Sequence, residues 1–397
     1  MRVLIVAGTY AGDRSNPWLL DDLAREFVAA GHTVDVLSFD PTGARPKGPI
    51  VQDIDRLDAF SVGSTHVRRG AVQKLLGYVQ AGIGLHVEGY RFVRRNTYDL
   101  CIYTSVASFS WGFPSRVRRA GIAKKLVLVL WDFFPIHQVE IGRIRARWLA
   151  APLKALERLA IRRADVVALM TPANERFFRS YHRGMSAETF LLPPWSSSGT
   201  DAPFTRHEMT RFTAVFGGQL VKGRGIDTLL AAAAILQADS APVDIIVAGD
   251  GSESGRLHDE AKRLGLTNVT FPGSMPRDEY RSMLARAHIG IAITVPGVTP
   301  PSFPSKIVEY CGLGLPVVVC VEPSSDAGDI VEQHSAGIKV LAGDARGVAD
   351  AIRRLLKAHE RGDFDVWRAS AHVFYESELS TRRAVRRLIS IESAAPA

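Results

Sequence analysis

Short apolar runs alternate with amphipathic stretches along the first part of the chain. Residues 2–7 form an almost wholly apolar run that ends at Gly8, residues 19–28 carry apolar side chains at helical spacing, and residues 33–38 form a second apolar run. A buried strand, a helix followed by glycine, and another buried strand are typical of a parallel α/β sheet. The pattern continues, with strands expected at 99–104, 125–131 and 165–170 and helices at 108–120 and 148–163.

The periodicity is lost between residues 184 and 208, where proline, serine and glycine gather as they do in linkers. It then restarts, with strands expected at 212–216, 243–248, 269–271, 289–293 and 317–321 and helices at 227–236, 253–264, 277–287, 306–313 and 347–359. We therefore predict an α/β protein of two domains. The expected division is an N-terminal domain at 1–185, a linker at 186–208, a C-terminal domain at 209–370, and a C-terminal helix at 371–397 that packs back on the N-terminal domain.

Composition narrows the class of protein. The chain is 46% hydrophobic and 23% charged, which excludes a disordered or fibrous protein. Its length of 397 residues exceeds that of a domain with a single hydrophobic core. Cys101, Cys311 and Cys320 lie in apolar runs without metal-ligand spacing, so we expect core thiols in a reducing compartment. No secretion signal precedes the first apolar run and no apolar run is long enough to span a membrane, so we expect a cytoplasmic protein.

The net charge of +8 is concentrated in one region. Residues 1–182 carry 26 Lys and Arg against 16 Asp and Glu, residues 183–397 carry 23 against 25, and residues 68–163 alone carry 18 against 5. In this basic region the cations flank apolar and aromatic side chains, a combination that suits the anionic, cytoplasmic face of a membrane. Nucleic acid is a competing acidic partner, but we find no nucleic-acid motif and expect none to bind. Solvated helix faces are the plain alternative.

A glycine-rich loop over residues 217–225 follows the first apolar run of the C-terminal half. Glycines between a strand and a helix let backbone N–H groups approach an anion, and Lys222 and Arg224 add positive charge that suits a diphosphate. The loop has no Gly-Lys-Ser/Thr and is not a Walker loop. A connector with solvated charges is the alternative.

A second glycine-rich turn, Gly249-Asp250-Gly251, follows the run at 243–248. A dinucleotide fingerprint requires an acidic residue at the end of the next strand, and residues 268–273 offer none, so we exclude NAD. The turn either faces a nucleotide or is a plain tight turn.

A proline-rich loop leads into the helix expected at 306–313. Ser305 and Lys306 stand at the helix start, where the helix dipole favours an anion. Glu309, one turn later, can accept two hydrogen bonds from a vicinal diol such as a ribose. A carboxylate that pairs with Lys306 is the alternative.

In order and spacing, these segments resemble the nucleotide-binding domain of retaining glycosyltransferases of family 4. The matching residues are Gly218-x-Leu220…Arg224-Gly225-Ile226-Asp227, Gly249-Asp250-Gly251, Val269-x-Phe271-x-Gly273 and Lys306-x-x-Glu309-Tyr310-x-x-x-Gly314-x-Pro316-Val317. The resemblance implies a GT-B fold, in which two Rossmann-like domains with parallel sheets face a central cleft. It also implies a nucleotide diphosphate sugar as donor, no obligate cofactor and no metal.

Carried over by position, the resemblance implies a donor site formed by Gly218, Gln219, Lys222, Arg224, Gly249, Asp250, Gly251, Gly273, Ser305, Lys306 and Glu309. Arg224 stands at the family's diphosphate-binding lysine, and Gln219 replaces a second basic residue, for which Lys222 is a substitute. Glu309 matches the ribose-binding glutamate of the family's Glu-x7-Glu motif, whereas Pro301 stands at the first glutamate. A branch of the family with a Pro-Ser-Lys loop is similar here.

In the N-terminal half, Asp132 and His137 follow the strand expected at 125–131, where many relatives carry His-Asp. Ligands of parallel sheets bind at the carboxyl ends of the strands, so we assign both residues to the sugar or the acceptor hydroxyl. The alternative is that Asp132 caps the following turn and His137 is merely exposed. Gly8, Gly12 and Asp13 form the first βα turn, which we expect to line the acceptor side of the cleft.

The resemblance implies transfer with retention, onto a lipid-linked, envelope-glycan or secondary-metabolite acceptor. We expect Arg224 and Lys306 to stabilise negative charge on the departing diphosphate, with Asp132 and His137 as further catalytic candidates. A sugar-nucleotide 2-epimerase of the same fold and a non-catalytic sugar-nucleotide-binding protein are the alternatives.

Overall fold

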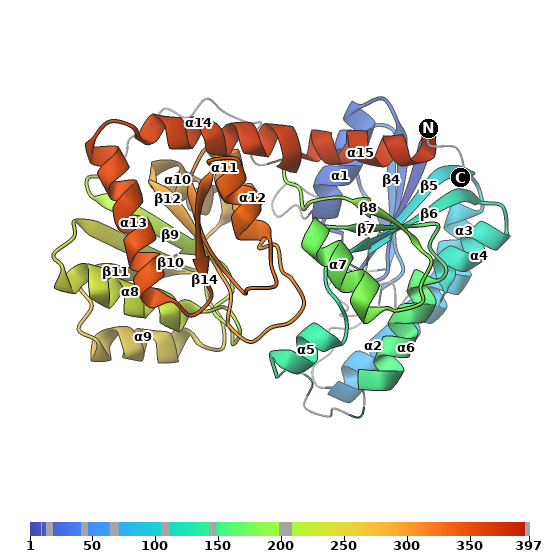
Figure 1. Cartoon of the computed structure of the whole chain (residues 1–397). Coiled ribbons are helices and arrows are strands. Elements are labelled where there is room, and N and C mark those ends of the chain that lie inside the picture. The colour runs from blue at the N-terminus through green and yellow to red at the C-terminus, as the bar shows by residue number, and fades with distance from the viewer. Residues whose placement is uncertain are drawn as a thin grey trace. The chain divides into compact units, whose positions relative to one another are not determined.

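The computed structural model describes residues 1–8, 10–12, 19–40, 47–63, 71–104, 112–142, 144, 148, 150–197 and 209–393 (Figure 1). The chain divides into two compact units. The first comprises Met1–Val139, Arg145–Pro193 and Thr381–Ala397, and the second comprises Glu140–Ile144 and Pro194–Ser380. Asp13 lies outside the described residues, and so does the part of the predicted linker after residue 197.

The first unit is built on a sheet of eight strands in the order β3-β4-β2-β1-β5-β6-β7-β8, in which β3 pairs antiparallel with β4 and the other neighbours are parallel. The strands are β1 (Arg2–Ala7), β2 (Thr33–Ser38), β3 (Gly48–Ile50), β4 (Leu57–Ser61), β5 (Tyr98–Thr104), β6 (Ala123–Leu130), β7 (Val166–Leu169) and β8 (Glu188–Leu191). The central strands read as apolar runs because helices cover both faces of the sheet.

The helices of the first unit are α1 (Leu19–Ala29), α2 (Ala71–Gly84), the π-helical η1 (Leu85–Gly89), α3 (Tyr90–Val93), α4 (Phe113–Arg119), α5 (Ile136–Glu140, whose last residue is grouped with the second unit), α6 (Ala150–Ile161), α7 (Pro172–Tyr181) and α15 (Thr381–Ser393). One face of the sheet packs against α2, η1, α4 and α6 through Ala81, Leu85, Phe113 and Ile161 respectively. The opposite face packs against α1, which lies beside α15 (Figure 1).

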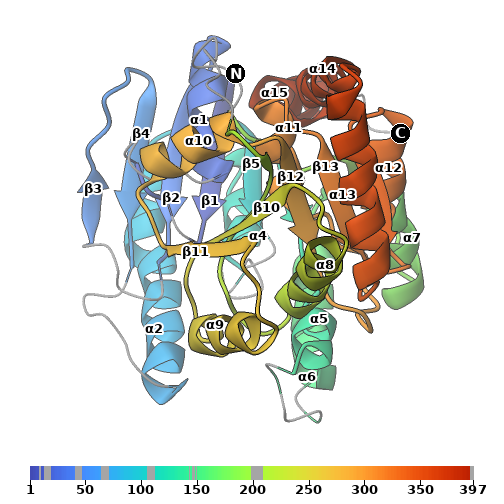
Figure 2. The ribbon, with the colours of Figure 1, turned by 90° about the vertical axis from the view of Figure 1, so that its left-hand side faces the viewer.

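The second unit contains a six-stranded parallel sheet in the order β11-β10-β9-β12-β13-β14, of which β11, β10, β12 and β13 are labelled in Figure 2. Its elements are β9 (Phe212–Gly217), α8 (Ile226–Ala238), β10 (Val243–Ala248), α9 (Ser254–Arg263), β11 (Val269–Gly273), α10 (Arg277–Arg286), β12 (Ile289–Ile293), α11 (Lys306–Gly312), β13 (Val317–Val321), α12 (Ala327–Gln333), β14 (Gly337–Leu341), α13 (Ala345–Glu360), α14 (Phe364–Phe374) and the π-helical η4 (Tyr375–Leu379).

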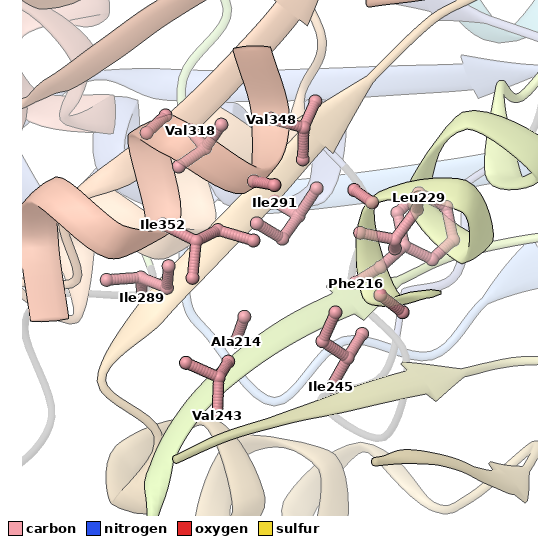
Figure 3. Close-up of a cluster of buried hydrophobic side chains, with 14 of the residues drawn as sticks. Ala214, Phe216, Leu229, Val243, Ile245, Ile289, Ile291, Val318, Val348 and Ile352 are labelled. Carbon is pink, nitrogen blue, oxygen red and sulfur yellow. The ribbon is translucent and has the colours of Figure 1, made fainter. Parts of the chain in front are cut away.

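A continuous apolar core joins this sheet to α8 and α13 (Figure 3). Ala214 and Phe216 of β9 point to the face where Leu229 of α8 and Ile352 of α13 pack, and all four are buried. The predicted α/β class with parallel sheets is confirmed, and so are the core thiols, because all three cysteines are free and buried. Burial also raises the pKa of each thiol.

Two predictions of local structure are wrong. The stretch 184–208, predicted to lack regular structure, contains β8, an edge strand whose residues are half-buried or exposed and therefore do not form an apolar run. The single helix predicted at 371–397 is instead α14, η4 and α15. Its break falls at Ser380, whose backbone is extended (φ −70°, ψ 148°), and only α15 belongs to the first unit. There Arg382 lies 3.8 Å from Glu26, and Lys125 Nζ donates to the carbonyl of Ile391 at 2.8 Å.

Candidate functional site

The strand order places a candidate ligand site in the second unit. Numbered from β9, the order is 3-2-1-4-5-6, and it reverses direction between β9 and β12. Open α/β sheets bind ligands outside the carboxyl ends of the strands at such a switch point. The glycine-rich loop 218–225 follows β9, and residues 294–305 follow β12 and lead into α11. We call the carboxyl ends of β9, β10, β11 and β12, with the loops that follow and the start of α11, the donor edge.

The turn after β10 is fitted to the loop after β9. Gly218 N donates to the carbonyl of Ala248 at 3.0 Å, and Leu220 N donates to that of Asp250 at 2.9 Å. Gly249 has φ 132°, and a Cβ there would lie 1.9 Å from the carbonyl oxygen of Gly218. The close approach of the two backbones therefore requires glycine at residue 249. Asp250 Oδ1 accepts from Gly251 N (2.7 Å) and Ser254 Oγ (2.6 Å), which holds the pKa of Asp250 below its ordinary value.

A pocket of about 270 Å³ opens on the helix side of the loop after β9, and Lys222, Gly223 and Arg224 are among its lining residues. Arg256, which the sequence analysis missed, also lines it and is held by two carboxylates. Its guanidinium donates to Asp227 at 2.7 and 2.9 Å and to Glu253 at 2.7 Å. These bonds lower the pKa of Asp227 and raise that of Arg256. Gln219 is exposed and lies outside this pocket.

The first turn of α11 carries the predicted charged pair. Lys306 Nζ donates to Glu309 Oε2 at 2.7 Å and lies 4.9 Å from the ring centroid of Tyr280. Tyr280 packs against Gly217, where a Cβ would lie 1.9 Å from the Tyr280 hydroxyl oxygen. Tyr310 Oη accepts from Gly217 N at 3.0 Å, and burial raises the pKa of both tyrosines. The two tyrosines thus connect Lys306 and Glu309 to the end of β9.

Buried Glu322 supports the loop that precedes α11. This carboxylate follows β13 and is 1% exposed. Its Oε1 accepts from Ser302 N at 2.6 Å and its Oε2 accepts from Thr294 Oγ1 at 2.8 Å. The loop at Pro301, which is itself buried, is therefore fixed by the end of the neighbouring strand. Sequence analysis missed Glu322, although its place at the carboxyl end of an apolar strand was a usable signal.

The remaining donor-site residues lie along the same edge. Ser305 is exposed and its side chain makes no capping hydrogen bond to α11. The N–H groups of Ile307 and Val308 donate to the carbonyls of Pro304 and Ser305 at 3.0 and 3.1 Å. Gly273 ends β11, and its carbonyl accepts from Gly249 N at 2.9 Å. The predicted donor residues thus all lie at the carboxyl edge of the second sheet.

In the first unit, Asp132 and His137 lie in or after the loop that follows β6. Asp132 is exposed, and His137 is half-buried in α5 with a buried Nδ1 that has no hydrogen-bond partner in the described part of the chain. The loop is held by Glu157, another residue that sequence analysis missed. Glu157 Oε1 accepts from Phe134 N at 2.8 Å, and its Oε2 lies 3.1 Å from Nε2 of His182. Burial raises the pKa of Glu157.

The first βα turn is only partly described. Gly8 is half-buried at the end of β1, and Gly12 is buried, with its N–H donated to Asp21 Oδ1 at 2.7 Å. Asp21, a buried carboxylate of α1, is a further residue that the sequence analysis did not single out. A larger pocket of about 700 Å³ lies at the β3–β4 edge, but none of its lining residues is a predicted site residue.

Neither a metal site nor a membrane span is found among the described residues. No group of three or more His, Cys, Asp or Glu side chains there could hold a metal ion. No described helix is both long and apolar enough to cross a membrane.

Comparison with known proteins identifies the second unit. Residues 211–358 match the family described as glycosyl transferases group 1. Over its full length the chain is 25% identical to a glycogen synthase of Mycobacterium tuberculosis (strain H37Rv), which it covers completely. Sucrose-phosphate synthase from Thermosynechococcus elongatus has a similar structure, with a TM-score of 0.75 at 14% identity over 99% of this chain and 98% of that one. Anabaena HepE, solved in complex with UDP and glucose, gives a TM-score of 0.65 at 17% identity over 99% of each chain. The fold is therefore GT-B, and the group 1 glycosyltransferase family matches this chain over residues 211–358.

Proposed function

We propose that this chain, with its group 1 glycosyltransferase domain, transfers a sugar from a nucleotide diphosphate donor to an acceptor hydroxyl with retention of configuration. The observation that carries the proposal is the Lys306–Glu309 pair at the start of α11, joined through Tyr280 to the end of β9. A cation, a carboxylate and a glycine-rich loop thus meet at the switch point of a parallel sheet, where nucleotides bind in folds of this class.

Glu309 and Lys306 bind two different polar parts of the donor, the ribose and the diphosphate. In the free protein each neutralises the other at 2.7 Å. When the donor binds, Glu309 accepts hydrogen bonds from the ribose hydroxyls and Lys306 turns to the diphosphate, so neither charge is left without a partner. UDP is the nucleotide present in the similar Anabaena structure and is the first donor base to test.

Arg224 and Lys222, in the loop after β9, act on the leaving group. The bond between the anomeric carbon and the diphosphate oxygen breaks, the acceptor oxygen bonds to that carbon on the same face, and the acceptor proton is released. Negative charge grows on the diphosphate as the bond breaks, and guanidinium or ammonium groups fixed nearby lower the barrier. Asp132 and His137 of the first unit are assigned to the sugar or the acceptor hydroxyl.

For the acceptor, we propose a lipid-linked or envelope-glycan substrate at an anionic membrane surface. Part of the apolar sequence in the basic region is core, because Leu85 is buried, but a stripe on α2 and η1 is exposed. Leu76, Val79, Ile83 and Val87 follow helical spacing and are 37–60% exposed. Apolar side chains beside excess cations are typical of interfacial helices. Arg68 and Arg69, also in the basic region, lie outside the described residues.

A thermal-shift screen of nucleotide sugars, followed by turnover of the stabilising donor, tests the donor site. The donor should raise the melting temperature of the wild type and of Glu279→Gln, an exposed carboxylate of α10, because a ligand at 100 times its Kd adds about 2.7 kcal/mol. Glu309→Gln should remove most of the shift. An equal shift in both variants would contradict the site, and a shift without turnover on any acceptor would indicate a sugar-nucleotide-binding protein instead.

A further inference from the structure

Three arginines of the first unit line a single pocket far along the chain from the donor edge. The pocket has a volume of about 460 Å³ and is lined by His86, Gly112, Arg116, Arg119, Ala120 and Arg163. They come from η1, from α4 and its ends, and from the turn after α6. No carboxylate is among the lining residues. We call this the arginine pocket.

The sequence of α4 brings two of the arginines to one side. Arg116 and Arg119 are three residues apart, so they project from the same face of the helix. Arg116 is fixed by its surroundings: Nη1 donates to the carbonyl of His86 at 2.6 Å, and the guanidinium carbon lies 3.8 Å from the ring centroid of Tyr90. This leaves Arg116 pre-oriented, with N–H donors that the contact to His86 does not use.

Arg163 reaches the pocket across a glycine. A Cβ at Gly112 would lie 2.4 Å from Arg163 Nη1, and Gly112 has φ 76°, so this position accommodates the guanidinium only because it lacks a side chain. Within the described part of the chain, none of the three arginines forms an ion pair with a carboxylate. The adjacent Arg118, in contrast, lies 3.5 Å from Asp165 and does not line the pocket.

We infer that the arginine pocket binds a phosphate group. Three guanidiniums that converge without an acidic partner repel one another, and an anion between them turns this repulsion into attraction. Guanidinium forks match phosphate oxygens with paired, charge-assisted hydrogen bonds, which a lysine cannot reproduce. The volume exceeds that of phosphate alone, so the phosphate can belong to a larger ligand, either a free phosphate ester or a lipid headgroup.

The site goes beyond the proposed glycosyl transfer and does not depend on it. The helices around the pocket also expose apolar side chains, Ile83 and Val87 on α2 and η1 and Leu156 and Leu159 on α6. A lipid headgroup in the pocket would place its acyl chains near such surfaces, whereas a soluble phosphate ester would not need them.

Two double variants with the same charge change test the site. Arg119→Gln/Arg163→Gln removes two pocket arginines, and Arg118→Gln/Arg162→Gln removes two exposed arginines, each adjacent in sequence to one of them, that do not line the pocket. The full chain is titrated with inorganic phosphate at constant ionic strength, with melting temperature as the readout. It is also sedimented with phosphatidylcholine vesicles with and without phosphatidic acid.

We expect the pocket variant to lose at least about tenfold in affinity and the control to stay within about twofold of wild type. This pattern with inorganic phosphate identifies a free phosphate site, and the same pattern only on phosphatidic acid vesicles identifies a lipid headgroup site. Equal losses in the two variants, or no binding by the wild type in either assay, would overturn the inference. Repeating the titration in an Arg224→Ala background separates this pocket from the donor edge, so either site can fail alone.

Discussion

At or beside the donor edge two cations are paired with carboxylates, whereas three cations line the arginine pocket with no carboxylate among its lining residues. Arg256 is held by Asp227 and Glu253, and Lys306 by Glu309. The balance of charges along the chain differs in the same way. Residues 68–163 carry 18 Lys and Arg against 5 Asp and Glu, whereas residues 183–397 carry 23 against 25. Paired cations allow a ligand to be exchanged during turnover, because the protein supplies counter-charges when the ligand leaves. Unpaired cations favour continuous occupation by an anion.

The largest effect should come from Arg224→Ala at the donor edge. If Arg224 stabilises the charge that develops on the diphosphate, its loss should lower kcat by about 10²–10³-fold, or ~2–4 kcal/mol. Arg346→Ala, which removes an exposed arginine of the same unit outside the pocket, is the matched control and should keep wild-type turnover. Single-turnover kinetics with the donor found in the screen give the comparison. A kcat within threefold of wild type in Arg224→Ala would remove this residue from the mechanism.

Glu322→Ala should have the next largest effect, on stability and donor binding together. The substitution removes the acceptor of Ser302 N beneath the loop that leads to α11 and leaves Thr294 Oγ1 only the carbonyl of Cys320, at 3.4 Å. We expect a loss of about 1–3 kcal/mol in stability. Thermal unfolding and donor affinity should both fall, since this loop precedes Lys306.

Glu322→Gln separates the two effects, because its carbonyl still accepts one of the hydrogen bonds and recovers part of the stability. Glu360→Ala, an exposed carboxylate at the end of α13, should change neither measurement. If Glu322→Ala kept wild-type donor affinity despite lower stability, the loop would not contribute to the donor site.

The sequence predicted the central strands well and the supporting groups poorly. Residues 33–38, 243–248, 289–293 and 317–321 are strands as predicted, because a strand buried on both faces must be apolar throughout. The edge strands β3 and β8 were not predicted, because their side chains are half-buried or exposed and therefore form no apolar run. The supporting roles of Glu322 and Glu157 were not predicted for another reason. A single buried carboxylate has no periodic pattern, and its hydrogen-bond partners are distant in sequence.

Site residues that lie within one segment of the sequence were also easier to predict than residues that the fold brings together from several segments. The donor-edge residues were found as motifs because each motif is a strand end with its following loop, which is local in sequence. The arginine pocket draws on η1, α4 and the turn after α6, residues 86 to 163, so sequence analysis recorded it only as an excess of charge.

Replacement of Glu157 should have an effect of intermediate size on stability, and this effect should depend on pH. Burial raises the pKa of this carboxyl above its ordinary value of 4.5, so the folded protein binds its proton more tightly than the unfolded chain does. The resulting stability is complete below pH 4.5 and is lost as the pH rises through the raised pKa. The melting temperature of the wild type should therefore fall relative to that of Glu157→Gln between pH 4.5 and neutrality. If the melting temperatures of the two proteins changed equally with pH across this range, the raised pKa of Glu157 would be contradicted.

The smallest expected effect tests the pairing itself. Asp227→Asn weakens one of the two carboxylate contacts of Arg256, and because the pair is largely exposed, the cost in stability should stay below about 1 kcal/mol. Removing a negative charge beside Lys222 and Arg224 should strengthen nucleotide diphosphate binding by about 1.5- to 5-fold, and the gain should disappear at high salt. Isothermal titration with UDP at two salt concentrations measures both, with Asp278→Asn, an exposed carboxylate of α10, as control. Weaker binding in Asp227→Asn would mean that Arg256 must be held in place to contact the donor, and the pairing would then position a ligand group rather than only neutralise charge.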